Sequence, residues 1–295
     1  MINFAHISDP HLSPLPPVTF RQVANKRVLG YLSWHRKRKH EHQAHVLRAL
    51  CADLMADAPD HICITGDLTN LGLPEEYAAA AAWLRQFGDP SSVSVIPGNH
   101  DAYIAMPRDV TRDHWAAWMA GDAPDSGFPY LRRRGFLSLI GVNTAVPTGP
   151  FMASGRIGRD QLRRLSACLD AEGQAGQCRV VLIHHPPQRG AVGWRKSLHD
   201  AAVVRDVLAR TGAELVLHGH LHKPVLASLT GPSGPIPVLG AGSASAAGTH
   251  KGQSAQYHRI QIRPANSETR YHLSATARVW SNRTQSFEDG PSLLP

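Results

Sequence analysis

Histidine, aspartate and asparagine residues recur at the ends of five short apolar segments of this 295-residue chain. The segments are HISDPH at 6–11, HICITGD at 61–67, VSVIPGNHD at 93–101, RVVLIHH at 179–185 and ELVLHGHLH at 214–222. Imidazole, carboxylate and amide groups together suit manganese, iron, zinc or cobalt better than an ion that prefers thiolates. These residue types at these places indicate metal chemistry.

Two of the segments place candidate ligands one residue apart, Asp9 with His11 and His220 with His222. Alternate side chains of an extended backbone point the same way, so each pair can reach one ion. About seven candidate ligands are too many for one tetrahedral zinc, but they suit two ions roughly 3.5–4 Å apart that share a carboxylate. We therefore expect two divalent or trivalent ions, of manganese, iron or zinc.

Strands and helices alternate through most of the chain. Apolar runs predict buried strands at 2–8, 61–65, 93–96, 136–142, 179–184 and 214–218. Helical patterns lie at 45–57, 74–87, 159–171 and 200–212. The alternation predicts an α/β fold with helices covering the sheets. Because the carboxyl ends of such strands meet at one edge, five segments should deliver ligands to one place.

The C-terminal part has a different character from about residue 236. Short strands at 236–240, 257–263, 269–275 and 276–281 predict a terminal antiparallel sheet, and 240–255 predicts a flexible loop. No repeat or linker divides the sequence. We therefore expect one domain over residues 1–295, with this β-rich part at its end.

Positive charge is concentrated near the start of the chain. The net charge is +8, and between Arg21 and Arg48 eight Lys or Arg accompany one acid, Glu41. The stretch at 32–45, LSWHRKRKHEHQAH, is the densest part, and we interpret about 15–45 as a basic helical insertion. Such a local excess favours contact with phosphate, nucleic acid or an acidic membrane surface. A solvated helix face is the plainer alternative.

Composition and the N-terminal residues bear on the class of protein. The charged fraction of 18% and the hydrophobic fraction of 42% are typical of a globular chain. The start, MINFAHISDPH, has neither a basic region nor a long apolar run, so a cytoplasmic location is expected. The four cysteines form no CxxC pair, which argues against a disulfide framework or a zinc knuckle.

Five motifs give the sequence a family resemblance. DPH, GDLTN, GNHD, HHPP and HGHLH, each after an expected strand, resemble the five blocks of the calcineurin-like metallophosphoesterases. GDLTNLGLPEEY and LVLHGHLHKP are most similar to the bacterial class III cyclic-nucleotide phosphodiesterase branch. The resemblance extends from about Ile2 to Gly242. It implies a four-layer αββα sandwich of two mixed β-sheets flanked by helices.

The resemblance also implies roles for individual residues. The implied ligands are Asp9, His11 and His222 for one ion and Asn99, His184 and His220 for the other, with Asp67 bridging them. His100 matches the family histidine that faces the substrate without binding metal. His184, two places before the first proline of HHPP, is the implied ligand of that motif, and His185 is its neighbour.

The implied reaction is hydrolysis of a phosphodiester. Two cations lower the pKa of a bridging water, giving hydroxide near neutral pH, and they neutralise the phosphoryl oxygens. The hydroxide attacks phosphorus in line, and His100 protonates the leaving group or stabilises its charge. Several relatives carry aspartate where this chain has Asn70, and an amide cannot stabilise an imidazolium as a carboxylate does. Asp101 is the nearby carboxylate that could replace it.

Two other functions remain open. Residues 20–39, FRQVANKRVLGYLSWHRKRK, combine apolar side chains with a cationic face, as an interfacial helix does. This favours a pyrophosphohydrolase of a lipid-linked nucleotide, similar to the UDP-diacylglucosamine pyrophosphohydrolases, that contacts the inner membrane face peripherally through residues 20–40. A non-catalytic metal-bound scaffold for RNA or DNA is the weaker alternative, because the segment lacks the interleaved aromatic residues of stacking platforms. Nucleic acid is therefore not expected as a partner.

The basic stretch is expected at the rim of the site, because it follows the strand that ends at Asp9. The residues expected to help bind an anionic phosphoester substrate are Arg36, Lys37, Arg38, Lys39 and His185. The seven ligands already complete a two-metal set, so the histidines of the stretch are not expected to bind metal. These histidines are His35, His40, His42 and His45.

Overall fold

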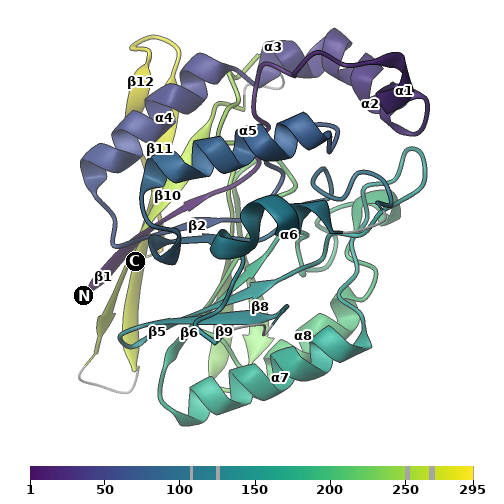
Figure 1. The fold of residues 1–295 in the computed structure, drawn as a ribbon. Helices are drawn as coiled ribbons and strands as arrows, with labels where there is room; N and C mark the ends of the chain where they lie inside the picture. The colour runs from purple at the N-terminus through teal and green to yellow at the C-terminus, as the bar shows by residue number, and fades with distance from the viewer. Residues whose placement is uncertain (107–108, 124–126, 250–252, 266–269, 295) are drawn as a thin grey trace.

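Two mixed six-stranded sheets pack face to face in the computed structural model (Figure 1). The structure describes residues 1–106, 109–123, 127–249, 253–265 and 270–294. In the first sheet the order is β12-β11-β10-β1-β2-β3, and in the second it is β4-β5-β6-β7-β9-β8. In the first sheet β1, β2 and β3 run parallel up to the β3 edge, and β10, β11 and β12 add an antiparallel half beside β1. In the second sheet β5, β6, β7 and β9 run parallel between the antiparallel edge strands β4 and β8.

The strand bounds are as follows. The first sheet contains β1 (Ile2–Ile7), β2 (His61–Ile64), β3 (Val93–Val95), β10 (Gln256–Pro264), β11 (Tyr271–Ser281) and β12 (Ser286–Leu294). The second contains β4 (Tyr130–Arg134), β5 (Leu137–Val142), β6 (Cys178–Ile183), β7 (Leu215–His218), β8 (Val225–Gly231) and β9 (Gly234–Gly240).

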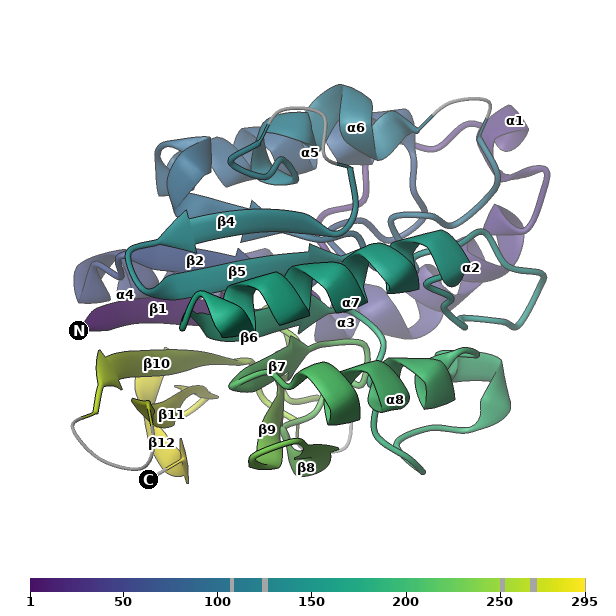
Figure 2. The same cartoon turned by 90° about the horizontal axis from the view of Figure 1, so that it is seen from below.

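Helices cover both outer faces (Figures 1 and 2). On the first sheet lie α4 (Ala44–Asp57) and α5 (Pro74–Leu84), and on the second lie α7 (Arg159–Gln174) and α8 (Ala201–Thr211). The other helical elements are α1 (Phe20–Val23), α2 (Arg27–Ser33), the π-helix η1 (Trp34–Arg38), α3 (Lys39–Glu41), α6 (Val110–Trp115) and the 3-10 turns η2 (Arg85–Phe87), η3 (Pro90–Ser92), η4 (Ala116–Trp118) and η5 (Trp194–Lys196).

The core follows the alternation of side chains along the strands. Leu137 and Leu139 of β5 join the buried cluster between the two sheets, whereas Ile140 and Val142 join the cluster beneath α7 and α8. Every residue of β5 is therefore buried on one face or the other, as is typical of a parallel strand covered on both sides. This arrangement confirms the predicted four-layer sandwich of two mixed sheets flanked by helices.

The six strands predicted from apolar runs are present as β1, β2, β3, β5, β6 and β7. The prediction of two strands at 269–281 was wrong, because the described residues from 271 form the single strand β11. The predicted terminal sheet is not separate. Its strand β10 pairs with β1 in the first sheet, and β9 pairs with β7 in the second. These pairings depend on residues far apart in the chain, which a local pattern does not reveal.

The prediction of a flexible loop at 240–255 was also wrong for residues 241–247. Residues 241–247 are buried, and Ser243 forms an isolated β-bridge with Ser8 at the end of β1. Small residues here allow close approach between the two sheets. Residues 250–252 lie outside the described part of the chain.

The N-terminal segment at 20–41 is helical, from α1 through α2 and η1 to α3. The helix does not run on into α4, because His42 and Gln43 adopt extended conformations between them. Among the described residues, no helix is long and apolar enough to cross a membrane.

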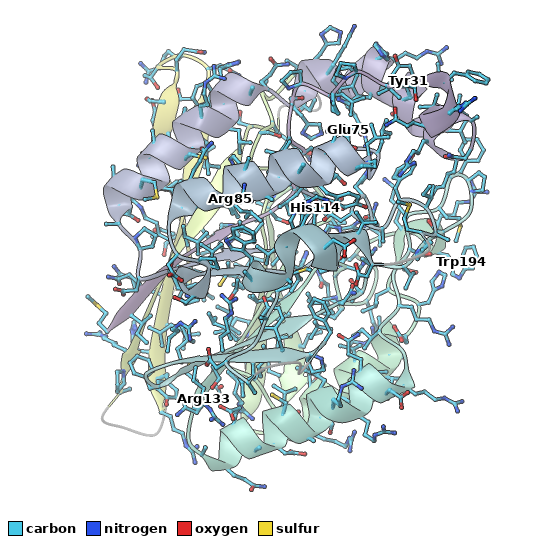
Figure 3. The ribbon with its side chains drawn as sticks, in the orientation of Figure 1. Tyr31, Glu75, Arg85, His114, Arg133 and Trp194 are labelled. Atoms are coloured by element: carbon cyan, nitrogen blue, oxygen red, sulfur yellow. The ribbon has the colours of Figure 1, made fainter. Side chains whose placement is uncertain are left out.

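A buried carboxylate joins α7 to the edge of the second sheet. Glu172 is 2% exposed at its side chain, and it accepts hydrogen bonds from Arg133 Nε at 3.0 Å and Ser138 Oγ at 2.6 Å. Arg133, labelled in Figure 3, projects from β4. Its hydrogen bond holds the pKa of Glu172 below the ordinary value of 4.5, although burial opposes this shift.

We predict that Glu172→Gln lowers the free energy of unfolding by about 1–2 kcal/mol at pH 7, because it removes a charge-assisted hydrogen bond. A depressed folded-state pKa stabilises the chain above the unfolded-state value, and this stability is lost as the pH falls through the folded-state value. The difference between the two proteins should therefore shrink below about pH 4. Urea unfolding at pH 7, 5 and 3 measures it, and a difference independent of pH would contradict the assignment.

Candidate metal centre

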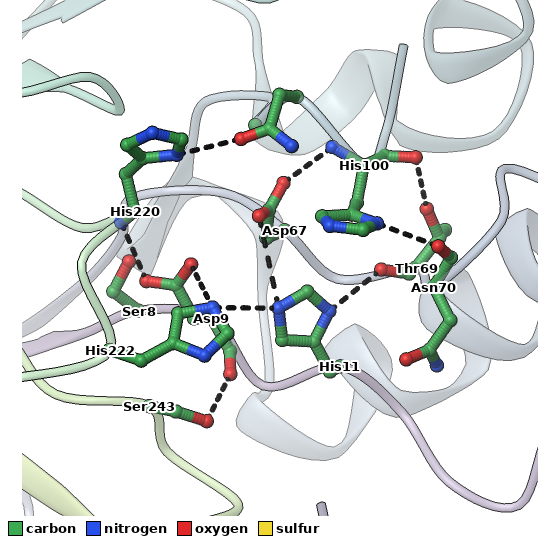
Figure 4. A network of polar contacts seen from close by, with 12 residues as sticks. Ser8, Asp9, His11, Asp67, Thr69, Asn70, His100, His220, His222 and Ser243 are labelled. Carbon is green, nitrogen blue, oxygen red and sulfur yellow. Dashed lines mark hydrogen bonds and ion pairs between the residues drawn. The ribbon is translucent and has the colours of Figure 1, made fainter. Parts of the chain in front are cut away.

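The predicted ligands converge at one edge of the two sheets (Figure 4). Asp9 and His11 follow β1, Asp67 follows β2 and Asn99 follows β3, all from the first sheet. His184 follows β6, and His220 and His222 follow β7, all from the second sheet. The site thus lies where the carboxyl ends of parallel strands from both sheets meet.

The first group of donor atoms surrounds one point. His11 Nε2 lies 3.1 Å from His222 Nε2, and His222 Nε2 lies 3.3 Å from Asp9 Oδ1. The same nitrogen of His11 is 3.8 Å from Asp67 Oδ2. Asp9, His11, Asp67 and His222 also form one of the His and carboxylate groups whose ligand atoms lie within 4.8 Å of one another.

The second group centres on the amide oxygen of Asn99. This Oδ1 lies 2.7 Å from His220 Nδ1 and 3.2 Å from His184 Nε2. His184 Nε2 is also 3.5 Å from Asp67 Oδ2. Asp67 therefore faces both groups from between them, as Figure 4 shows for His11 on one side.

Backbone carbonyls fix which nitrogen of each ring carries the proton. His11 Nδ1 donates to Thr69 O at 3.0 Å, His184 Nδ1 to Thr65 O at 2.6 Å, and His220 Nε2 to Lys196 O at 2.9 Å. The other nitrogen of each ring then directs its lone pair into the site. Ligating histidines are commonly held in this way.

The predicted ligand atoms are better matched to cations than to one another as hydrogen-bond partners. The lone pair of His220 Nδ1 faces the Asn99 oxygen, which is itself an acceptor, and within the described residues the buried Oδ1 of Asp9 accepts no hydrogen bond. Donor atoms about 2.1 Å from a shared ion lie roughly 3 Å apart, close to the distances observed. Burial opposes protonation of His184, yet the Asp67 carboxylate raises the pKa of that ring to about 9, so the site attracts positive charge.

The backbone at the site adopts conformations that side chains disfavour. Asp9, His11, Asp67, His220 and His222 have positive φ of 50°, 37°, 57°, 72° and 53°. Such values are uncommon in residues other than glycine, and they cluster at functional sites. Between β7 and His220, Gly219 leaves no room for a Cβ, which would meet Ser8 Oγ and lie 2.5 Å from Asp9 Oδ2.

Two buried carboxylates hold the loops that carry the ligands. Asp101 accepts the backbone N–H groups of Asp67, Thr69 and Gly98 at 2.8–2.9 Å. Burial and the neighbouring Asp67 raise the pKa of Asp101 to about 7. Glu76 at the start of α5 accepts the N–H groups of residues 70, 71 and 73 at 2.6–3.0 Å. Both carboxylates therefore shape the chain after β2.

His100 contacts Arg38 and the main chain of Asn70. His100 Nδ1 donates to Asn70 O at 2.6 Å, and Arg38 lies 2.7 Å from His100 Nε2 and 3.2 Å from Nδ1. The amide of Asn70 turns away and donates to Leu12 O at 2.9 Å. The expected alternative partner Asp101 instead binds backbone amides, so a carbonyl orients the ring where several relatives are expected to use a carboxylate.

The basic stretch divides into one inward and three outward side chains. Arg36, Lys37 and Lys39 are exposed, whereas Arg38 is half-buried and contacts His100. Their exposures differ because only one side of the short π-helix η1 faces the site. His185 is buried, and its ring nitrogens contact Thr144 Oγ1 at 2.7 Å and Ala153 O at 3.2 Å.

His42 is a residue of the site that the sequence did not reveal. Its ring is 2% exposed and lies 4.5 Å from the His11 ring and 5.5 Å from the His222 ring, measured between centroids. Its place in a basic stretch, outside any of the five motifs, gave no signal. Only the tertiary contact of residues 41–43 with residues 245–247 brings it inward.

Comparisons with known proteins agree with this geometry. Residues 2–224 match the family model described as calcineurin-like phosphoesterase. A probable cyclic nucleotide phosphodiesterase of Synechococcus is 28% identical over 182 residues, or 59% of this chain and 62% of that protein. Another from Rhodococcus erythropolis is 30% identical over 206 residues, or 67% of this chain and 62% of that protein. The matched region thus spans 62% of the length of each relative.

Solved structures share the fold at low sequence identity. A dimetal phosphatase from Danio rerio has a TM-score of 0.63 at 13% identity, over 99% of this chain and 98% of that one. A purple acid phosphatase from yellow lupin seeds has a TM-score of 0.61 at 11% identity, over 98% of this chain and 52% of that one. The family match covers all five strand-end motifs up to His222. The chain therefore belongs to the calcineurin-like phosphoesterase family.

Proposed function

We propose that this chain is a two-metal phosphoesterase that hydrolyses a phosphodiester. The observation that carries the proposal is the inward-facing set of imidazole, carboxylate and amide groups at the edge of both sheets. In this account Asp9, His11 and His222 hold one ion. Asn99, His184 and His220 hold the other, and Asp67 lies between them. The single domain at 1–295 brings all seven residues to the site.

The donor set favours ions that accept mixed nitrogen and oxygen ligands, namely manganese, iron or zinc. When bound, the two ions would supply a bridging hydroxide as nucleophile and neutralise charge on the phosphoryl group. The residues of the chain would orient the substrate and exclude bulk water from the site. The buried ring of His11 and the carboxylates of Asp9 and Asp67 form its floor.

His100 and Arg38 are the residues placed to handle the substrate. Nδ1 of His100 is fixed by the Asn70 carbonyl, so Nε2 is the atom that faces outward beside Arg38. The guanidinium offers several N–H donors in one plane and carries a permanent charge, which suits a phosphoryl oxygen. We propose that Arg38 binds the phosphoryl group and that His100 contacts the leaving-group oxygen.

The relatives support a phosphodiester as the bond that is cleaved. Two proteins named as probable cyclic nucleotide phosphodiesterases resemble this chain over 59% and 67% of its length. A single phosphoryl group between two ester oxygens would present two free oxygens to the site. The charge of Arg38 matches such a group.

We predict that His100→Ala lowers kcat on bis(4-nitrophenyl) phosphate by at least about 100-fold, the smaller end of typical acid–base effects. The manganese content, measured by elemental analysis after gel filtration, should stay at the wild-type value, because His100 is not a ligand in this account. The exposed His40→Ala variant is the matched control. Unchanged turnover in His100→Ala would contradict the role of this ring.

A second observation favours the lipid-linked pyrophosphate as an alternative substrate. Phe20, Val28 and Leu32 of the helical segment are 83%, 43% and 44% exposed. Exposed Arg36 and Lys37 follow them in the chain. An exposed apolar and cationic segment is typical of proteins that bind anionic lipid surfaces.

Two variants separate these substrates. We predict that Arg38→Ala lowers kcat/KM on any phosphodiester by about 10- to 100-fold, since it removes a charged contact worth about 1.4–2.7 kcal/mol. The combined Arg36→Ala, Lys37→Ala and Lys39→Ala variant should retain wild-type activity on bis(4-nitrophenyl) phosphate. If this triple variant loses activity only on a substrate embedded in anionic vesicles, the lipid-linked pyrophosphate is favoured as the substrate. Equal losses of kcat/KM in the two variants on bis(4-nitrophenyl) phosphate would contradict the proposal that Arg38 binds the phosphoryl group.

A further inference from the structure

His42 lies at the metal centre although it comes from the basic N-terminal segment. Its ring is buried against the rings of His11 and His222. These three histidines form one of the groups whose ligand atoms all lie within 4.8 Å of one another. Donor atoms on opposite sides of a shared ion at about 2.1 Å lie roughly 4.2 Å apart. The 4.8 Å limit is only slightly longer, so a small contraction would let the three nitrogens share one ion.

The backbone around His42 is held by the buried segment 241–247. His42 forms an isolated β-bridge with Ala246, Gln43 N donates to Ser245 O at 2.9 Å, and Ala247 N donates to Glu41 O at 2.8 Å. These contacts explain why the helix ends at residue 41 and why the chain becomes extended before α4. A side chain on this fixed backbone is preorganised toward the site.

Two serines orient the ring of His42. Ser243 Oγ donates to Asp9 O at 2.7 Å, so its contact with His42 Nδ1 at 3.3 Å is one that the hydroxyl accepts. Ser245 Oγ lies 2.9 Å from the same nitrogen. With the proton on Nδ1, both serine oxygens can accept it, and Nε2 carries the lone pair. This is the same protonation pattern that carbonyls impose on His11 and His184.

We propose that His42 is an additional ligand, through Nε2, of the ion that Asp9, His11 and His222 hold. The inference rests on the proposed two-metal function and deepens it, because it assigns this ion a ligand from outside the five family motifs. The residues that would hold this ion come from two overlapping groups, one of His11, His42 and His222 and the other of Asp9, His11, Asp67 and His222. His185 is grouped in the same way with His184 and His220, but its two ring nitrogens contact Thr144 Oγ1 and Ala153 O. The two ions would then be unequal.

Ligation by His42 would also link metal binding to the substrate contact of Arg38. His42 N donates to Arg38 O at 2.8 Å, so the two residues belong to the same final turn of the segment. An ion that binds His42 would fix that turn, and with it the guanidinium beside His100. Metal at this position would thereby help to assemble the phosphoryl-binding side of the site.

The experiment compares His42→Ala and His42→Gln with the exposed control His40→Ala. Each protein is stripped with a chelator and titrated with Mn²⁺ by calorimetry, and Co²⁺ replaces Mn²⁺ for visible absorption spectra. We expect one of two Mn²⁺ sites to weaken by about 10- to 100-fold or more in both His42 variants, as when groups at a metal site are removed. The Co²⁺ spectrum should change in both His42 variants and stay unchanged in His40→Ala.

The outcomes separate this inference from the proposed function. Two Mn²⁺ ions bound with wild-type affinities by folded His42→Ala, together with an unaltered Co²⁺ spectrum, would overturn the ligand role alone. Failure of the unsubstituted chain to bind two ions would overturn the two-metal function and the ligand role with it. Circular dichroism of each variant establishes folding, and the His42→Gln variant keeps the site filled if His42→Ala unfolds.

Discussion

Lone pairs that face one another across a buried space are the constraint on which this structure depends. The Asn99 oxygen lies 2.7 Å from His220 Nδ1, whose ring donates its proton to Lys196 O from the other nitrogen. Without a cation, such atoms repel one another and lose their hydrogen bonds to water at a cost of several kcal/mol. The surrounding protein must therefore hold these atoms in place against that repulsion. The packed sheets and the loops at their edge provide this support.

Both sheets and the loops at their common edge hold the proposed ligands in position. The carboxyl ends of strands from each sheet supply the proposed ligands, so the site forms only when the sheets pack together. Five of the ligand residues take positive φ, and the carboxylates of Glu76 and Asp101 tie down the loops after β2 and β3 with hydrogen bonds to backbone amides. Rigid support of this kind is what a preorganised catalytic site requires.

Local patterns predicted six of the buried strands and the convergence of candidate ligands at their ends, because both depend on short segments in which an apolar run ends in a residue able to bind metal. They did not predict the union of β10 with β1 or the burial of residues 241–247, which depend on contacts over some 240 positions. The same limit applies to the basic stretch. Composition marked this stretch as a candidate binding surface, but the packing of η1 against the site determines that Arg38 contacts His100 while Lys37 and Lys39 are exposed.

The central claim is that two ions occupy the site on either side of Asp67. A crystal grown with Mn²⁺ and measured at a wavelength of strong anomalous scattering tests it most directly. The account predicts two anomalous peaks roughly 3.5–4 Å apart, one beside His11 and His222 and the other beside His184 and His220. A single peak, or peaks away from these residues, would contradict it.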